Sequence, residues 1–165
     1  MSRPVVVADS GPLIALACCN CLKLLPAVFD AIHVPRAVLI ETAADRARPG
    51  ATDIAAFVQT HAQVHPDRDD AIYAAAASHL DEGEAQALSL AHALGCAVLM
   101  DERRGRQTAI EQGLPLFGVL GVLLQAKRIG KIEHIAPVLD RMQINGYRVA
   151  QALIEEALKL AGEKC

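Results

Sequence analysis

Short runs of apolar residues without alternation predict the strands of this chain. Residues 5–8 form a β-branched run of this kind, and residues 97–100 form a second one. A strand that is apolar on both faces is typical of a parallel sheet, because helices cover such a sheet on both sides. Three shorter segments are weaker candidates for strands: residues 32–34, 63–65 and 116–117.

The segments between these runs have the apolar spacing and the end signals of helices. The clearest of them, at residues 81–94, has a capping-box pattern of Asp81 followed by Glu84, and Gly95 ends it. Ser10 begins the first helix as its predicted cap. Helices are predicted at residues 10–19, 22–29, 36–44, 51–60, 69–79, 81–94, 103–112, 119–128, 132–142 and 149–161.

Strands that alternate with helices predict a three-layer α/β fold with a central parallel sheet, in a single domain over residues 1–165. Ligands of such folds bind outside the carboxyl ends of the strands. Asp9 and Asp101 stand at the ends of the two best predicted strands, so they are candidate ligand-binding residues. Each also has an alternative role as a helix cap, Asp9 for the first helix and Asp101 for the helix that starts near Arg103.

Two glutamates lie on or beside apolar helix faces. Glu84 shares its face with Leu88 and Ala91, and an ionised carboxylate that points inward needs a partner. The backbone N–H of Asp81 would be that partner in a capping box, whereas a metal ion is the other possibility. Glu41 borders an apolar face, where a solvated edge position is the alternative. Several carboxylates that converge at one strand-end cleft would suit Mg²⁺ or Mn²⁺.

Composition and charge narrow the class of protein. Apolar residues make up 53% of the chain and the net charge is −3, which excludes a disordered chain and a uniformly basic surface. Nucleic-acid binding would therefore need a local basic patch. No apolar stretch is long enough for a membrane span, and Asp9 interrupts the first apolar run too early for a signal peptide. We expect a cytoplasmic protein whose five cysteines are reduced.

Four segments carry a further signal. They are VADSGPLIAL at 7–16, VP at 34–35 leading to Glu41, LDEGEAQAL at 80–88 and LMDERRGR at 99–106. Their combination resembles the PIN-domain family, in particular relatives of the VapC-like toxin nucleases with a Leu-Asp-x-Gly-Glu motif. Residues 118–131 are similar to the same relatives, and the resemblance covers residues 4–161.

This resemblance implies a three-layer α/β/α PIN-like fold and a metal-dependent endoribonuclease. It implies that Asp9, Glu41, Glu84 and Asp101 hold one or two divalent cations, Mg²⁺ or Mn²⁺, and direct water onto an RNA phosphodiester. One position departs from the pattern, because many VapC-like toxins have an aspartate where this chain has Glu84. The longer side chain shifts the ligand geometry. The resemblance also implies the toxin of a toxin–antitoxin pair, with a cognate antitoxin protein and a homodimer.

Ser10 and three arginines are candidate substrate-binding residues. Ser10 would donate to a phosphate or to a ligand carboxylate. Arg103, Arg104 and Arg106 occupy the first turns of a predicted helix, where the macrodipole makes each cation unfavourable by roughly 0.3 to 1 kcal/mol. An RNA phosphate beside Asp101 would explain this placement, and a solvated basic face is the alternative.

A binding module is the alternative function. In that case the same fold holds RNA or a partner protein without turnover, as the glutamate at position 84 would permit. We expect the homodimer to use the apolar helices at 13–25 and 119–124 as its interface.

Overall fold

A parallel sheet lies at the centre of the computed structural model, which describes residues 2–164. Its five strands are β1 (Val5–Ala8), β2 (Ala31–Pro35), β3 (Gln63–His65), β4 (Ala97–Leu99) and β5 (Leu116–Phe117). Every neighbouring pair is parallel, in the order β3-β2-β1-β4-β5. The three-layer α/β prediction is therefore confirmed, including the three weaker strands.

Helices connect these strands at nearly all of the predicted positions. They are α1 (Ser10–Cys18), α2 (Leu24–Val28), α3 (Arg36–Leu39), α4 (Ala51–His61), α5 (Ala71–Ala77), α6 (Glu82–Leu94), α7 (Arg103–Glu111), α8 (Val119–Arg128), α9 (Ala136–Ile144) and α10 (Gln151–Leu160). The helix predicted at 36–44 is interrupted, because α3 passes into a π-helical turn, η1 (Ile40–Ala44). Within residues 2–164, none of these helices is long and apolar enough to cross a membrane.

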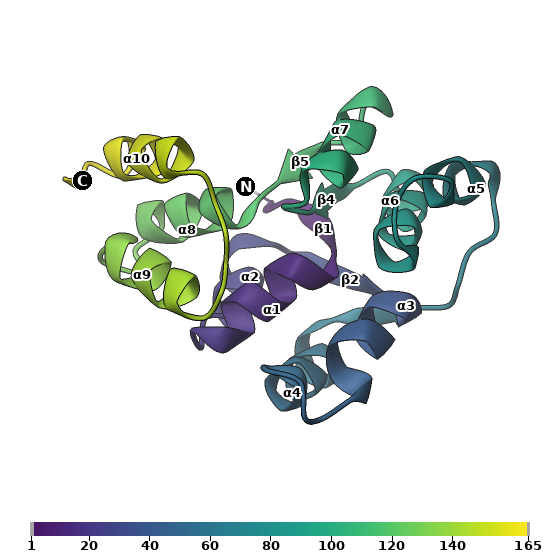
Figure 1. The fold of residues 1–165 in the computed structure, drawn as a ribbon, viewed down its shortest axis with the longest axis horizontal. Coiled ribbons are helices and arrows are strands. Elements are labelled where there is room, and N and C mark those ends of the chain that lie inside the picture. Colours follow the sequence, from purple (N-terminus) through teal and green to yellow (C-terminus); the bar gives the residue numbers. More distant parts are fainter. Residues whose placement is uncertain (1, 165) are drawn as a thin grey trace.

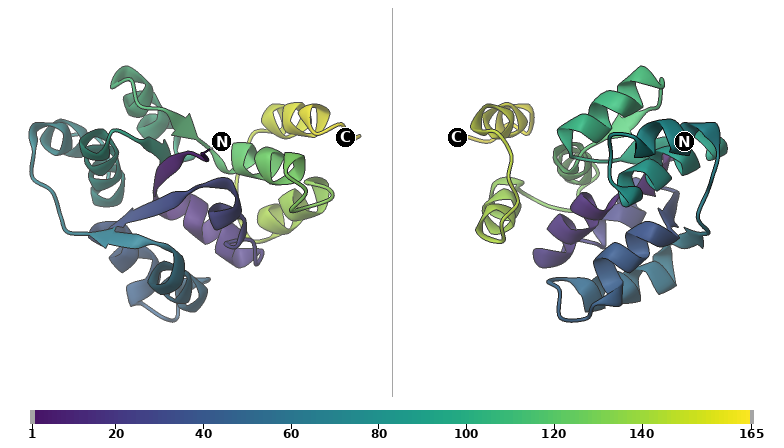
Figure 2. Two further views of the ribbon diagram at one scale, coloured as in Figure 1. Left: turned by 180° about the vertical axis from the view of Figure 1, so that it is seen from behind. Right: turned by 45° about the vertical axis from the view of Figure 1, so that its right-hand side comes forward.

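Successive residues of the central strand β1 pack into two different cores. Val6 and Ala8 belong to the core formed with helices such as α1, α2, α8 and α9, whereas Val7 belongs to the core formed with α5, α6 and α7. Side chains alternate across a strand, so an apolar run without alternation is what a sheet covered on both faces requires. In space, α8 to α10 gather at one end of the molecule and α5 and α6 at the other (Figure 1, Figure 2).

Two of the helices that we expected to form a dimer interface are instead core elements. Leu13 and Leu16 of α1 and Val122 and Leu123 of α8 are fully buried within the chain. Their apolar faces belong to the core on one side of the sheet, so these four side chains are not available to an interface, and the dimer stays a prediction. An amphipathic pattern predicts that one face of a helix is buried. It does not show whether the same chain or a partner chain buries that face.

The helix starts also differ from the prediction in one respect. Asp9, and not Ser10, is the N-cap residue of α1, and its side chain makes no capping hydrogen bond. In α6 the prediction was better, because the Asp81 side chain accepts a hydrogen bond from the Glu84 backbone N–H at 2.8 Å. Gly95 then ends α6 with a left-handed φ of 64°, a conformation that glycine adopts without steric cost.

The strand order creates a switch point beside β1. The chain lays β2 and β3 on one side of β1, and then returns to place β4 and β5 on the other side. At such a point the connections leave the sheet in opposite directions, and a crevice opens outside the carboxyl ends of the two strands. Here those strands are β1 and β4, which are followed by Asp9 and Asp101.

Candidate metal centre

Asp9 lies at the centre of the acidic site. It follows β1 directly, and its backbone N–H donates to the carbonyl of Leu99 in β4 at 3.0 Å, which continues the sheet by one more hydrogen bond. The residue is 5% exposed. Its Oδ1 atom is buried and has no hydrogen-bond partner in the described residues, so this carboxylate oxygen is available to a ligand.

Glu41 reaches the same end of the sheet from the turn after β2. It lies in the π-helical turn η1, and π turns shift the direction of side chains relative to an α-helix and occur often at functional sites. The hydroxyl of Ser10 donates to Oε2 of Glu41 at 2.7 Å. Ser10 therefore orients a candidate ligand carboxylate, which is one of the two roles expected for it.

The start of α6 fits closely against this pair. A methyl group on Gly83 would come within 2.6 Å of Oε2 of Glu41 and within 3.5 Å of Oγ of Ser10. Only a residue without a side chain can occupy this position without moving the Glu41 carboxylate. The Leu-Asp-x-Gly-Glu motif thus places its glycine against one candidate ligand, and Glu84, the next residue, enters the site from the same turn.

The Glu84 carboxylate lies near both the Asp81 side chain and the start of α7. A methyl group on Gly105 of α7 would lie 3.2 Å from Oε2 of Glu84, which locates this carboxylate between α6 and α7. Among residues 2–164, no hydrogen bond joins the Asp81 backbone N–H to the Glu84 side chain. Only half of the expected capping box is therefore present, and it is the half in which Asp81 accepts.

The electrostatics show that these acids face one another. Burial raises the pKa of Asp9 from its ordinary value to about 7, although a hydrogen bond from the Ser10 backbone opposes part of this rise. The negative charges of Asp81, Glu41 and Asp101 raise it further. No ion pair compensates Asp9 within the described residues, so the fold keeps a buried acid among like charges.

Glu84 has a perturbed pKa for the same reasons. Burial is the largest cause, followed by a hydrogen bond with the Asp81 side chain and by the charges of Asp81 and Asp9, and together they raise the pKa of Glu84 to about 8. Pairs of acids with raised pKa values in one cleft are typical of functional sites. Asp9 thus links the four predicted acids. The charges of Glu41 and Asp101 raise the pKa of Asp9, and the charge of Asp9 raises the pKa of Glu84.

Asp101 forms a hydrogen bond with the start of α8, and not with the start of α7 as expected. Its Oδ1 accepts a hydrogen bond from the backbone N–H of Val119, the first residue of α8, at 3.1 Å. The prediction that it caps the helix near Arg103 was wrong, since Glu102 occupies the N-cap of α7. Burial raises the pKa of Asp101, which the Val119 N–H and the nearby Arg106 lower in part. The carboxyl also lies beside the Tyr147 hydroxyl, which lowers the same pKa.

Two residues that the sequence reasoning did not place in the site belong to its surroundings. Asp81 was interpreted only as a helix cap, yet its charge acts on both Asp9 and Glu84. Its position three residues before Glu84 was a usable signal. Tyr147 lies beside Asp101, and its buried hydroxyl is close enough to the Asp101 carboxyl to lower the pKa of that group. Nothing in the local sequence around Tyr147 indicated this contact.

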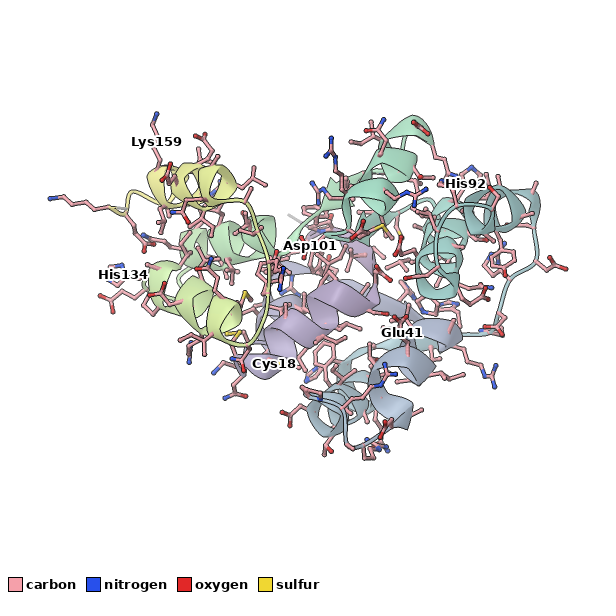
Figure 3. The ribbon with its side chains drawn as sticks, viewed as in Figure 1. Cys18, Glu41, His92, Asp101, His134 and Lys159 are labelled. Carbon is pink, nitrogen blue, oxygen red and sulfur yellow. The ribbon has the colours of Figure 1, made fainter. Side chains whose placement is uncertain are left out.

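The three predicted arginines differ in exposure and in their contacts. Arg103 and Arg104 are exposed at the start of α7, whereas Arg106 is half-buried. The Arg106 guanidinium donates to the carbonyl of Met100 at 2.8 Å, so it supports the loop that carries Asp101 as well as facing the site. Figure 3 shows Asp101 between the two ends of the molecule and Glu41 beside α3.

The donor set fits a divalent cation. Carboxylate oxygens are the ligands that Mg²⁺ and Mn²⁺ prefer, and Asp9 Oδ1 is a buried atom that no donor of the described residues satisfies. Among residues 2–164, no group of three His, Cys, Asp or Glu side chains lies close enough together to hold a metal ion. Mutual repulsion keeps carboxylates apart, and a cation removes that repulsion.

The fold and this site define an α/β protein with an acidic centre at the switch point of a parallel sheet. The chain belongs to the PIN-domain family, since the family model described as DUF3368, PIN domain, matches residues 5–163. PIN domains are generally nuclease domains that use divalent metal ions. The family resemblance predicted from the sequence is confirmed.

A solved structure supports the fold independently of sequence. A PilT N-terminus domain protein from the hyperthermophilic archaeon Sulfolobus solfataricus superposes with a TM-score of 0.51, at 12% sequence identity. The match covers 74% of this chain and 92% of that one. At this identity the similarity concerns the fold alone. No curated protein matches the sequence.

Proposed function

We propose that this protein is a divalent-metal-dependent endoribonuclease in which Asp9, Glu41, Glu84 and Asp101 hold Mg²⁺ or Mn²⁺. The observation that carries the proposal is the state of Asp9. It is a buried carboxylate at the switch point, without a counter-ion in the described residues, and the charges of Asp81, Glu41 and Asp101 surround it. Such an arrangement is costly unless a cation occupies it.

Each acid has a distinct role in holding the ion. Asp9 would bind through Oδ1, which has no donor among the described residues, and Asp101 through the oxygen that does not accept from Val119. Glu41 would complete the shell in the orientation that the Ser10 hydroxyl gives it, and Glu84 would do so from the α7 side. A bound divalent cation supplies an activated water at neutral pH and offsets negative charge on a phosphodiester.

The substrate side of the proposal rests on α7. Arg103 and Arg104 are exposed two and three residues after Asp101, where they would contact backbone phosphates and keep the strand over the acids. Phosphate contacts of this kind position a nucleic acid without reading its sequence. The choice of RNA as the substrate is supported by the resemblance to VapC-like nucleases.

The same resemblance supports a biological role. We propose that the protein is the toxin of a toxin–antitoxin pair, that a cognate antitoxin protein binds it, and that it forms a homodimer in the cytoplasm. The interface of this dimer has to lie on surfaces other than the buried faces of α1 and α8. Light scattering at micromolar concentration would measure the assembly.

Cleavage of RNA is the direct test. Purified protein incubated with single-stranded RNA and Mn²⁺ should cleave it, and EDTA should stop the reaction. Asp9→Asn should abolish cleavage, because it removes the central ligand. Asp53→Asn, which changes an exposed aspartate of α4, is the matched control and should remain active. Cleavage that persists in Asp9→Asn would come from a contaminant and would contradict the proposal.

A binding module without turnover is the second candidate. The carboxylates of the described residues are not already grouped at metal-binding distances, which is also what a site without catalysis would show. Such a module would bind single-stranded RNA in EDTA and in Mn²⁺ with equal affinity, and would leave the RNA intact under both conditions. A nuclease would bind more tightly with the cation present and release shorter products.

A further inference from the structure

A pocket of about 590 Å³ opens directly beside Asp101. It is lined by parts of α7, β5 and α8, and by the start of α10 with the segment before it. The pocket walls therefore come from segments that are far apart in the sequence. Asp101 and Tyr147 both line this pocket, and the Tyr147 hydroxyl lies beside the Asp101 carboxyl. Its volume lies within the range of small-ligand sites.

Much of the pocket wall is apolar. Ile110 of α7 and Leu153 of α10 line it while remaining 60% and 55% exposed, and Leu120 and Val149 add further apolar surface. Large apolar side chains that remain exposed beside polar groups mark a binding surface. A flat aromatic ligand would cover these side chains.

The rim of the same pocket is positively charged. Arg103, Arg106 and Arg148 all line it, and in the described part of the chain no ion pair engages any of them. Guanidinium groups bind phosphates and also stack on the faces of bases. The pocket therefore combines an apolar wall and cationic groups next to a candidate metal ligand.

We propose that this pocket binds the nucleobase of the nucleotide next to the scissile phosphate. The inference rests on the proposed ribonuclease function, and it adds a subsite that takes one unstacked base of the substrate. With the phosphate at Asp101, the adjoining base enters between Ile110 and Leu153, while Arg103 and Arg148 hold the neighbouring phosphates. A base in a duplex cannot enter without being unpaired, which costs a few kcal/mol.

The charges favour a nucleotide over an apolar peptide as the occupant. An apolar peptide helix would cover Ile110 and Leu153 but would leave Arg103 and Arg148 without a counter-charge, which is costly where the contact is buried. A nucleotide offers a ring for the apolar wall and phosphate oxygens for the arginines.

The test compares two leucines of the same helix. Leu153→Ala removes part of the pocket wall, whereas Leu160→Ala changes a residue of α10 that is 67% exposed and lies outside the pocket. Fluorescence anisotropy with a labelled eight-nucleotide single-stranded RNA in EDTA measures affinity without turnover. Leu153→Ala should weaken binding about tenfold, because it removes apolar surface that the base would cover. Leu160→Ala should bind as wild type does.

An abasic RNA makes the test specific for a base. When one nucleotide at a time is replaced by abasic ribose, one position should lower the affinity of wild type, and on that RNA Leu153→Ala and Leu160→Ala should bind equally. Equal affinity of the two variants for intact RNA would overturn the base pocket. If the pocket effect is found but Mn²⁺ gives no cleavage, the base pocket stands and the nuclease function fails.

Discussion

At the scale of single residues, Asp9 determines how the protein responds to pH. Its pKa in the folded state is about 7, against 3.8 for an unperturbed aspartate, so the folded protein binds more protons than the unfolded chain between these values. Stability then falls as the pH rises through this window. The raised pKa of Glu84 acts in the same direction.

We predict that Asp9→Asn removes much of this pH dependence. In EDTA, the unfolding free energy of wild type should decrease relative to the variant between pH 4 and pH 7, by an amount on the order of 4 kcal/mol. Denaturation at a series of pH values measures it, and the histidines cancel because they titrate in both proteins. Mn²⁺ at a hundredfold excess over its Kd should stabilise wild type alone, by about 2.7 kcal/mol. A variant that is less stable than wild type at pH 7 in EDTA would instead indicate a capping role for Asp9.

Ser10 is the residue that orients Glu41, so its hydroxyl should matter for the metal. We predict that Ser10→Ala weakens Mn²⁺ binding by roughly 10- to 100-fold, as is usual when the partner of a ligand is removed. Calorimetric titration measures the Kd. The control is Ser78→Ala, whose hydroxyl bonds only within its own region of the surface. Unchanged Mn²⁺ affinity in Ser10→Ala would show that the 2.7 Å contact with Glu41 is not needed for binding.

At the scale of helices, the start of α6 sets the room left for the Glu41 carboxylate. Gly83 is the second residue of α6, and an alanine there would press on Oε2 of Glu41 at 2.6 Å. Because that atom ends a flexible side chain, the helix should tolerate the change while the carboxylate moves away from Ser10. The site would be altered without unfolding the protein.

We therefore predict that Gly83→Ala changes stability by no more than about 1 kcal/mol and lowers Mn²⁺-dependent cleavage at least tenfold. Gly11 is a matched control, since it is the second residue of α1 and an added methyl group would meet no atom within 4 Å. Gly11→Ala should retain cleavage. Full activity in Gly83→Ala would mean that the Glu41 position is not part of catalysis.

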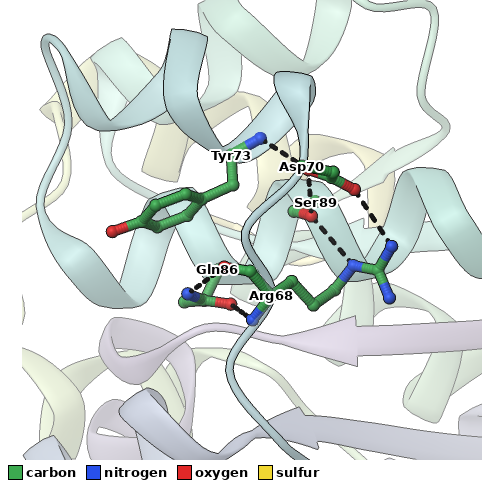
Figure 4. A network of polar contacts seen from close by, with 5 residues as sticks. All are labelled: Arg68, Asp70, Tyr73, Gln86 and Ser89. Atoms are coloured by element: carbon green, nitrogen blue, oxygen red, sulfur yellow. Dashed lines mark hydrogen bonds and ion pairs between the residues drawn. The ribbon is translucent and has the colours of Figure 1, made fainter.

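A polar network holds α6 in place behind the acidic site (Figure 4). The backbone N–H and carbonyl of Arg68 pair with the side chain of Gln86 at 2.8 and 3.0 Å. Ser89, which is fully buried, donates to Asp70 and accepts from the Arg68 guanidinium. These contacts join the loop before α5 to the helix that carries Glu84.

We predict that Ser89→Ala destabilises the fold by about 1 to 3 kcal/mol, because the Arg68 guanidinium loses its buried acceptor and Asp70 loses a donor. Thermal and chemical denaturation measure the change. Ser78→Ala again serves as the control and should stay within about 0.5 kcal/mol of wild type, as is usual for an exposed position. A Ser89→Ala variant as stable as wild type would show that the network is compensated by water.

At the scale of the whole molecule, RNA binding has to overcome a net charge of −3 and the acidic centre. The binding charge must therefore be local, and α7 supplies it. Exposed Arg103 and Arg104 should each contribute a phosphate contact, whereas Arg106 already bonds to the carbonyl of Met100. The structure thus separates the three arginines, which the sequence pattern had grouped.

We predict that replacing Arg103 and Arg104 with alanine lowers RNA affinity and reduces the slope of log affinity against log salt by about 0.7 for each phosphate that is no longer bound. Titration of single-stranded RNA at several salt concentrations in EDTA measures this slope. Arg128→Ala, at the exposed end of α8, is the control and should leave it unchanged. A slope that is the same in the double variant would assign the two arginines to a solvated face.

The sequence by itself determined the order of strands and helices, the family, and which acids stand at the strand ends. These properties depend on apolar periodicity and on turn residues a few positions apart, as at residues 5–8 and 81–95. Only the tertiary structure decided that the Asp101 carboxylate holds the start of α8, that Asp81 acts on Asp9, and that Tyr147 and Arg148 lie beside Asp101. Contacts of this kind join side chains that are 18 to 72 positions apart in the chain. Strand order and helix packing bring them together, and no local pattern records either of these.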